Sequence, residues 1–267
     1  MKQSSWRAAL FNLCLLTLLV VGEFMLRYRV IFDYNRARMW ADRLASRMSR
    51  TVFAVTAMYM DHQIARTSSV GRSDLPSQFV LIANYQSIVD IPILLSSFPH
   101  HSLRFTAKRS LFRYIPLVSL VLRVQRHAAV YRGSSNAKTL SDLRRLARMC
   151  EEGISPVVFP EGTRSRTGEL NRFQPGAMYL MAKNCQIPVV CVSMDGGYRV
   201  ADASSLGRNL QGCRYRVHIE KVYEPPKTRR QTERLLRDSE ARIRARLISW
   251  RQKKQAVPAL PEPATPA

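Results

Sequence analysis

The sequence predicts an α/β protein that begins with a membrane-anchoring helical segment. Two short apolar runs of strand type, at residues 79–83 and 155–159, each end in a cluster of polar residues and indicate the sheet. An uncharged apolar stretch at residues 8–22 indicates the anchor. A chain of 267 residues has room for one substantial domain and this extension, so we expect a single core.

The anchor is bounded by Arg7 and Glu23. A helix needs about 20 apolar residues to cross a bilayer, so this stretch is a borderline span, and spanning or lying in the interface are both open. No small-residue cleavage site follows it, which favours an uncleaved anchor over a signal peptide. Arginines after the stretch outnumber Lys2 and Arg7 before it, so the domain is expected on the cytoplasmic side, at the inner membrane in a bacterium.

Residues 27–50 combine arginines with apolar residues at helical spacing, including Trp40. The pattern predicts one basic amphipathic helix, which would lie at the headgroup level and meet anionic lipid. The alternative is an ordinary helix packed on the domain. We therefore expect an anchor at 1–50 and the main domain at 51–226.

The net charge of +23, from 42 Lys and Arg against 19 Asp and Glu, indicates an anionic partner. A phospholipid surface, a phosphorylated substrate and a nucleic acid all fit this charge. The basic segments lack a recognised nucleic-acid module and the chain carries an apolar anchor, so we expect no nucleic-acid partner.

Cysteine and histidine spacing predicts neither a metal site nor a disulfide framework. The five cysteines form no CxxC pair and their number is odd, which fits a reducing compartment. The five histidines have no ligand-like spacing, so no structural metal is expected. The cysteines are Cys14, Cys150, Cys185, Cys191 and Cys213.

Two polar clusters carry the candidate chemistry. Residues 84–90 read NYQSIVD, and Asp90 opens an apolar stretch as the N-cap or first-turn residue of a helix. After the second strand, Gly162 allows close backbone approach to a ligand, and the Arg164 fork suits phosphate. A plain loop salt bridge between Glu161 and Arg164 is the alternative. Ligands in open α/β sheets bind at such carboxyl ends of strands.

These clusters resemble two blocks of the glycerol-phosphate and lysophosphatidic acid acyltransferases. Residues 84–90 are similar to the NHxxxxD block, and residues 159–165, FPEGTRS, match the second block completely. Weaker similarities lie at residues 105–108 with 115–116, 129–132, 173–177 and 187–190. The resemblance covers residues 79–194 and implies a single mixed-sheet acyltransferase domain.

The resemblance implies transfer of a fatty acyl group from acyl-CoA or acyl carrier protein to a lysophospholipid-like acceptor, most simply 1-acylglycerol 3-phosphate, in phospholipid biosynthesis. The implied partners are the donor, the acceptor and an anionic membrane surface, and no cofactor is needed. In the family, the histidine of the first block is the general base and the aspartate orients it. Those positions are Tyr85 and Asp90 here.

The remaining site residues also follow from the resemblance. Asn84 and Ser87 would shape the acyl-transfer centre. As alternatives for the two outlying cations, Arg132 ends a strand and Lys108 is an ordinary surface residue. The residues implied to bind the acceptor phosphate are Glu161, Gly162, Thr163, Arg164, Arg132 and Lys108.

Tyr85 leaves three accounts of the chemistry open. A phenol has a pKa of about 10 and accepts a proton poorly at neutral pH, so His100, His101 or His127 would have to serve as base from another loop. Alternatively, neighbouring cations lower the pKa of Tyr85. In the third account the protein binds lipid or carrier without catalysis. A further alternative is an acceptor that is not a precursor of phosphatidic acid, such as an amino-acid lipid.

Two other segments complete the prediction. Residues 111–122 are apolar between basic clusters and fit either a segment that dips into the membrane or a core helix carrying a proline. Residues 227–254 contain eleven basic and three acidic residues and predict a basic helix, which fits a solvated face, anionic lipid or an acidic carrier protein. Residues 255–267 are expected to be disordered.

Overall fold

The computed structural model describes residues 3–131, 136–200 and 212–255, and these build a mixed six-stranded sheet in the order β1-β8-β7-β2-β6-β3. Only β7 and β8 pair antiparallel, so the expected mixed α/β sheet is confirmed. A parallel pair, β4 and β5, lies apart from it. The strands are β1 Gln63–Ser68, β2 Val80–Ala83, β3 Leu103–Arg104, β4 Thr106–Lys108, β5 Ala128–Val130, β6 Ser155–Val158, β7 Val189–Asp195 and β8 Arg214–Tyr223.

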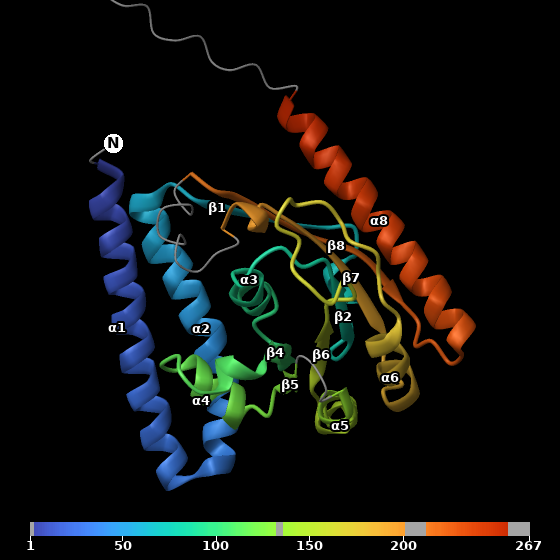
Figure 1. Ribbon diagram of the computed structural model, residues 1–267, viewed down its shortest axis with the longest axis horizontal. Coiled ribbons are helices and arrows are strands. Elements are labelled where there is room, and N and C mark those ends of the chain that lie inside the picture. Colours follow the sequence, from blue (N-terminus) through green and yellow to red (C-terminus); the bar gives the residue numbers. More distant parts are fainter. Residues whose placement is uncertain (1–2, 132–135, 201–211, 256–267) are drawn as a thin grey trace, which may run out of the picture.

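Helices cover both faces of the sheet (Figure 1). One face packs against α1, α2 and α3, and the other against α5, α6 and α8. All four residues of β2 are buried. Leu81 and Ala83 pack in the apolar core on the α1, α2 and α3 side, and Val80 and Ile82 pack in the core on the α5, α6 and α8 side. The helices are α1 Gln3–Phe32, α2 Tyr34–Met60, α3 Asp90–Ser97, α4 Val118–Val124, α5 Asn136–Arg148, α6 Gly176–Asn184 and α8 Arg229–Gln255. The short 3₁₀ turns are η1 Arg72–Asp74, η2 Arg109–Phe112, η3 Met149–Glu152 and η4 Gly197–Val200.

The N-terminal region is a helical hairpin, so the prediction of one amphipathic helix over residues 27–50 is wrong. Asp33 separates the two helices, because its backbone is extended and its Oδ1 accepts a hydrogen bond from the Arg36 backbone N–H at 2.9 Å, which caps α2. The boundary expected at residue 50 falls inside α2. Residues Ala9–Phe32 of α1 are long and apolar enough to cross a membrane. Only 17% of the most apolar 18 residues of this segment are buried.

Residues 111–122 do not form one helix. They include the end of η2, a turn at Pro116 and the start of α4, and Leu117 and Leu120 pack against Leu26 and Ala41 of the hairpin. The Leu117 backbone N–H donates to Glu23 Oε2 of α1 at 3.0 Å. The segment therefore joins the anchor to the domain.

The C-terminal basic helix is present as α8. Its inner side is buried against the sheet through Leu235, Leu236, Ile243 and Leu247, and its arginines occupy the other positions. The position of the apolar residues therefore determines which side of α8 packs on the sheet. The tail expected to be disordered was residues 255–267; Gln255 is the last residue of α8, and residues 256–267 lie outside the described residues.

The expectation that the cysteines form no disulfide is wrong for one pair. Cys150, in η3 directly after α5, is bonded to Cys185, the residue after α6. Their separation of 35 residues carries no sequence signal, because the pairing depends on α5 packing against α6. Cys14, Cys191 and Cys213 are not disulfide-bonded.

Candidate active site

Three loops meet at one edge of the sheet. Strand β2 pairs in parallel with both β6 and β7, so the carboxyl ends of all three lie together. Residues 84–90 follow β2, residues 159–165 follow β6, and residues 196–200 follow β7. This is the location where open α/β sheets bind their ligands.

Backbone and side-chain hydrogen bonds join the two predicted blocks. The Tyr85 N–H donates to Glu161 Oε1 at 2.7 Å, and the Ser165 N–H donates to the Tyr85 carbonyl at 2.8 Å. Asn84 ties the same loop to β7, because its side chain both donates to the Met194 carbonyl and accepts from the Met194 N–H, each at 2.8 Å. The blocks therefore form one rigid unit.

Asp90 is a fully buried carboxylate at the first residue of α3. Its Oδ2 accepts from the backbone N–H groups of Gln86 at 2.6 Å and Ser87 at 2.8 Å, whereas Oδ1 has no hydrogen-bond partner in the described part of the chain. Burial raises the pKa of Asp90 to about 7, and the Glu161 charge acts in the same direction. A Cβ on Gly197 would lie 2.6 Å from Oδ1, so only glycine permits this approach.

The Tyr85 ring stacks on Phe159, with centroids 4.3 Å apart and planes 15° from parallel. Burial, and then the Asp90 charge, raise the pKa of Tyr85 to about 12, although Arg164 lowers it. The raised pKa argues against the account in which neighbouring cations make Tyr85 a phenolate. Tyr85 presents a neutral phenol beside Asp90.

The three histidines considered as substitute bases lie elsewhere. His127 is buried, its Nδ1 accepts from the Phe105 N–H at 2.9 Å, and its Nε2 lies 2.8 Å from Gln125 Oε1. Burial lowers the pKa of His127 to about 3. His100 and His101 follow the carboxyl end of α3, whereas Asp90 opens that helix. Within the described ranges, no group of His, Cys, Asp and Glu residues could hold a metal ion.

The residues predicted to bind phosphate divide into three groups. Gly162, Thr163 and Arg164 are exposed on the loop after β6, and the Arg164 charge acts on both Tyr85 and Asp90. Glu161 is buried and accepts from the backbone N–H groups of Tyr85 and Asn171, so its carboxylate organises the loop.

The two outlying cations are not part of this unit. Lys108 is exposed at the end of β4, which belongs to the separate two-stranded sheet. Arg132 lies outside the described residues.

Sequence reasoning missed the third loop and the glutamine that binds it. Gln86 Oε1 accepts from the Gly197 N–H at 2.9 Å, and Gln86 Nε2 lies 3.4 Å from Asp195 Oδ1. Ser87 Oγ donates to the Val200 carbonyl at 2.6 Å, which fits its predicted site-shaping role. The only signal in the sequence was the Gly196-Gly197 pair directly after a strand.

An apolar cavity of about 310 Å³ lies beside the first block. Ile88 and Val89 line one side, and residues of α1, α2 and the α4 region line the others. Gln125, His127 and Ser49 are its polar lining residues. The site thus combines a buried carboxylate, a phenol and an exposed arginine with a mainly apolar cavity.

These features define an α/β protein whose candidate catalytic unit joins the ends of three parallel strands beside an apolar cavity. The Acyltransferase family model matches residues 66–195, which contain the first two loops and end at Asp195, directly before the third. Residues 66–195 therefore form a domain of this acyltransferase family.

Relatives and one solved structure agree with this assignment. The chain is 28% identical over 207 residues to the chloroplastic 1-acyl-sn-glycerol-3-phosphate acyltransferase BAT2 of Brassica napus, a match that covers 75% of this chain and 54% of that protein. It is 29% identical over 190 residues to the lyso-ornithine lipid O-acyltransferase of Pseudomonas aeruginosa, covering 66% and 70%. The crystal structure of the 1-acyl-sn-glycerophosphate acyltransferase PlsC from Thermotoga maritima matches with a TM-score of 0.72 at 20% identity, covering 96% of this chain and 98% of that one, and shares the fold. The chain spans about half the length of the plant relatives that it matches.

Proposed function

We propose that the protein transfers a fatty acyl group from a thioester donor to the hydroxyl of a lysophospholipid, with 1-acylglycerol 3-phosphate as the acceptor. The observation that carries the proposal is the union of the two blocks, which brings Asp90 and Arg164 to one site beside the apolar cavity. A negatively charged headgroup fits the exposed arginine, and an acyl chain fits the cavity. The names of the plant relatives point to the same acceptor.

In the proposed reaction Asp90 takes the proton of the acceptor hydroxyl while the hydroxyl oxygen attacks the thioester carbonyl carbon. The carbon–sulfur bond then breaks, and the leaving thiolate recovers the proton from Asp90. A base works best when its pKa is near the working pH, which the buried Asp90 meets and Tyr85 does not. Tyr85, as a neutral phenol, can donate a hydrogen bond to the oxyanion that forms.

The proposed location is the membrane surface, with the domain on the cytoplasmic side. Support comes from α1, whose outer side carries large exposed apolar residues such as Leu13, Phe24 and Ile31. Arg43, Arg47 and Arg50 lie exposed on α2 at positions suited to anionic lipid headgroups. Binding of this hairpin to lipid would place the apolar cavity, which α1 and α2 line, next to the acyl chains of the bilayer.

Two observations favour alternatives that the same experiment separates. The match to a lyso-ornithine lipid O-acyltransferase favours an amino-acid lipid as acceptor. The neutral phenol at position 85 favours a protein that binds lipid or carrier without transferring the acyl group.

The test is transfer of labelled acyl groups from acyl-CoA or acyl carrier protein to 1-acylglycerol 3-phosphate and to lyso-ornithine lipid by the full chain in detergent. We expect transfer to the phosphate-bearing acceptor, a loss of about 10²–10⁴-fold in Asp90→Asn and a smaller loss in Tyr85→Phe. We expect Tyr85→His to transfer faster near neutral pH. Transfer by Tyr85→His alone, with none by the natural chain, would establish the non-catalytic alternative.

A further inference from the structure

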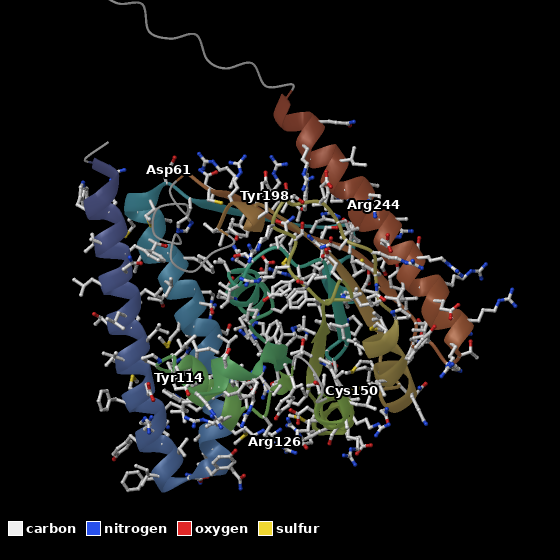
Figure 2. All side chains as sticks on the ribbon, viewed as in Figure 1. Asp61, Tyr114, Arg126, Cys150, Tyr198 and Arg244 are labelled. Carbon is white, nitrogen blue, oxygen red and sulfur yellow. A yellow bond between two sulfur atoms is a disulfide. The ribbon has the colours of Figure 1, made fainter. Side chains whose placement is uncertain are left out.

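Two arginines flank one tyrosine ring beside the candidate site. The guanidinium carbons of Arg199 and Arg251 lie 5.8 Å and 5.7 Å from the centroid of the Tyr198 ring. Arg199 comes from η4 after β7, and Arg251 comes from the last turns of α8. Tyr198 lies at the upper edge of the molecule in the view of Figure 2, near the α8 ribbon. We refer to Tyr198, Arg199 and Arg251 as the arginine cluster.

Hydrogen bonds connect the arginine cluster to both candidate blocks. Gln86, whose N–H binds Asp90, accepts from the Gly197 N–H at 2.9 Å and from the Tyr198 N–H at 3.4 Å. Arg251 Nη2 donates to the carbonyl of Gly168, in the loop that continues from Arg164, at 2.5 Å. The cluster is therefore held at a fixed position on the rim of the site.

The arginine cluster keeps capacity to bind an anion. Arg199 is exposed, and its Nε donates to Tyr198 Oη at 3.4 Å. Arg251 also lies 3.4 Å from Asp195 Oδ1, but 36% of its side chain is exposed. Contact with an aromatic face holds a guanidinium plane in place while leaving its N–H groups available to an acceptor.

The sheet order places Arg199 and Arg164 on opposite sides of the loop that carries Asp90. Strand β2, which leads to Asp90, lies between β6, which leads to Arg164, and β7, which leads to Arg199. A reaction between two phosphate-bearing molecules needs a separate cation site for each, one on either side of the reacting groups. Arg164 is assigned to the acceptor in the proposed function, which leaves the cluster on the side of the donor.

We propose that Arg199 and Arg251 bind the phosphate of the phosphopantetheine arm that carries the acyl thioester. The inference rests on the proposed function, because only a thioester donor brings such an arm. The thioester and the phosphate are at opposite ends of the arm, so the phosphate must be held on the rim while the carbonyl reaches Asp90. Coenzyme A and acyl carrier protein both carry this arm, so the arginine cluster would bind the part that the two donors have in common.

The test measures binding by calorimetry to the full chain in detergent, with coenzyme A, free 4′-phosphopantetheine and pantetheine as probes. The variants are Arg199→Ala, Arg251→Gln and the double variant. Arg237→Ala is the matched control, because Arg237 is an exposed arginine of the same helix, about 21 Å along the axis from Arg251.

We expect the double variant to bind coenzyme A and phosphopantetheine about 10- to 100-fold more weakly, with pantetheine binding and the control unchanged. Equal weakening of pantetheine, or a loss confined to coenzyme A, would overturn the assignment to the arm phosphate. If the double variant unfolds because the Gly168 contact is lost, Arg199→Ala alone decides, with a loss of about 3- to 10-fold expected and no loss contradicting the proposal.

Kinetics then separate the two sources of the arm and the two proposals. A rise in KM for acyl carrier protein as well as acyl-CoA, at unchanged KM for the acceptor, supports recognition of the shared arm, and a rise for neither overturns it. If phosphate-dependent binding holds but no acceptor is acylated, the proposed function fails while the donor site stands.

Discussion

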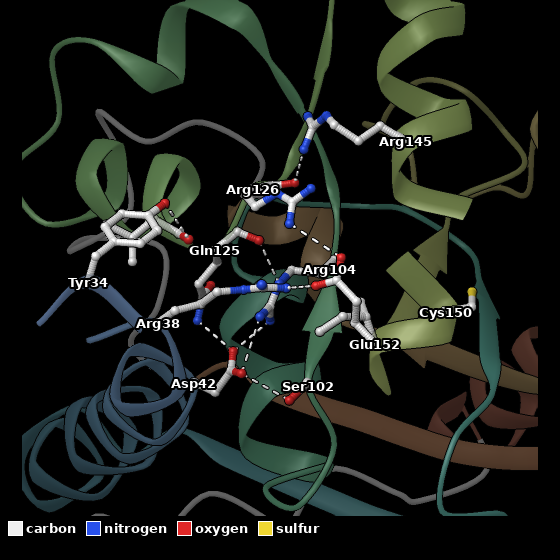
Figure 3. A network of polar contacts seen from close by, with 12 residues as sticks. Tyr34, Arg38, Asp42, Ser102, Arg104, Gln125, Arg126, Arg145, Cys150 and Glu152 are labelled. Atoms are coloured by element: carbon white, nitrogen blue, oxygen red, sulfur yellow. Dashed lines mark hydrogen bonds and ion pairs between the residues drawn. The ribbon is translucent and has the colours of Figure 1, made fainter. Parts of the chain in front are cut away.

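Arg104 at the end of β3 forms a buried ion pair with Asp42 of α2. Arg104 Nη1 lies 2.6 Å from Asp42 Oδ1, and the arginine side chain is only 1% exposed (Figure 3). Arg104 Nε also donates to the Gln125 carbonyl, while Ser102 Oγ and Gln125 Nε2 donate to Asp42. This network fixes the N-terminal helical hairpin against the sheet, and Gln125 also lines the apolar cavity.

Replacing Asp42 by Ala should therefore destabilise the protein strongly. The change leaves the buried Arg104 charge without its partner, which costs about 3–5 kcal/mol. The free energy of unfolding can be measured by urea titration in detergent. Arg36→Ala is the control, because it removes an ion pair whose arginine is 83% exposed and should cost less than about 1 kcal/mol. Equal losses in both variants would show that the Arg104 pair adds nothing beyond a surface contact.

Asp90 predicts how stability depends on pH. Its pKa is raised from 3.8 to about 7 by burial, so the folded state holds a proton that the unfolded state releases. The contribution of Asp90 to stability is full below about pH 4, falls as the pH rises to about 7 and is constant above, with a total change on the order of 4 kcal/mol.

The measurement compares urea unfolding of the natural chain and Asp90→Asn at pH 4 to 8. Burial also raises the pKa of Glu161, and the charges of Glu161 and Arg164 act on Asp90, so Asp90 is examined through the difference between the two proteins. We expect that difference to change by a few kcal/mol across the window. A difference that is constant with pH would mean that Asp90 is ionised at every pH tested.

The outer side of α1 predicts membrane binding without a role in folding. Leu13, Phe24 and Ile31 are 63%, 71% and 79% exposed, so replacing all three by Ser should leave the melting temperature unchanged and release much of the protein from lipid vesicles. Sedimentation with vesicles at high salt is the measurement. Leu26→Ser is the contrasting variant, because Leu26 is buried against α2 and α4 and should lower stability instead. Full retention of the triple variant on vesicles would assign membrane binding to another surface.

The sequence predicted the parts of the site that follow strands directly. Apolar runs end at Asn84 and Phe159, and parallel pairing of β2 with β6 places both motifs at one edge. It did not predict Arg251, because the contact of Arg251 with Gly168 depends on how α8 packs, across 83 positions of the chain. The pairing of β1 with β8 was also not predicted. Strand β1 is almost entirely exposed, so its sequence has no apolar alternation that would indicate a strand.

The break in the N-terminal helix had a different cause. Helical spacing of apolar residues continues past Asp33, so the hydrophobic pattern alone predicted one helix. The helix is interrupted at Asp33, whose side chain accepts a hydrogen bond from the Arg36 N–H and caps α2. A single local hydrogen bond of this kind does not appear in the periodicity of the sequence.

Arg164 is where the proposed acceptor phosphate would bind, and its chemistry predicts a graded response. Arg164→Ala should weaken a phosphate-bearing acceptor by about 1.5–3 kcal/mol for each charge-assisted hydrogen bond lost. Arg164→Lys should restore only part of the affinity, because lysine keeps the charge but loses the planar fork that binds two oxygens together. Calorimetry with 1-acylglycerol 3-phosphate and with its unphosphorylated analogue measures both effects.

The unphosphorylated analogue separates binding from loop structure. The loop is already held by Glu161, whose carboxylate accepts from the N–H groups of Tyr85 and Asn171, so loss of the Arg164 side chain should leave the backbone in place. Binding of the analogue should then be unchanged in Arg164→Ala. If the phosphorylated and unphosphorylated acceptors weaken equally, Arg164 supports the loop and the phosphate must be bound by other residues. Because binding alone is measured, the result holds whether or not Tyr85 permits catalysis.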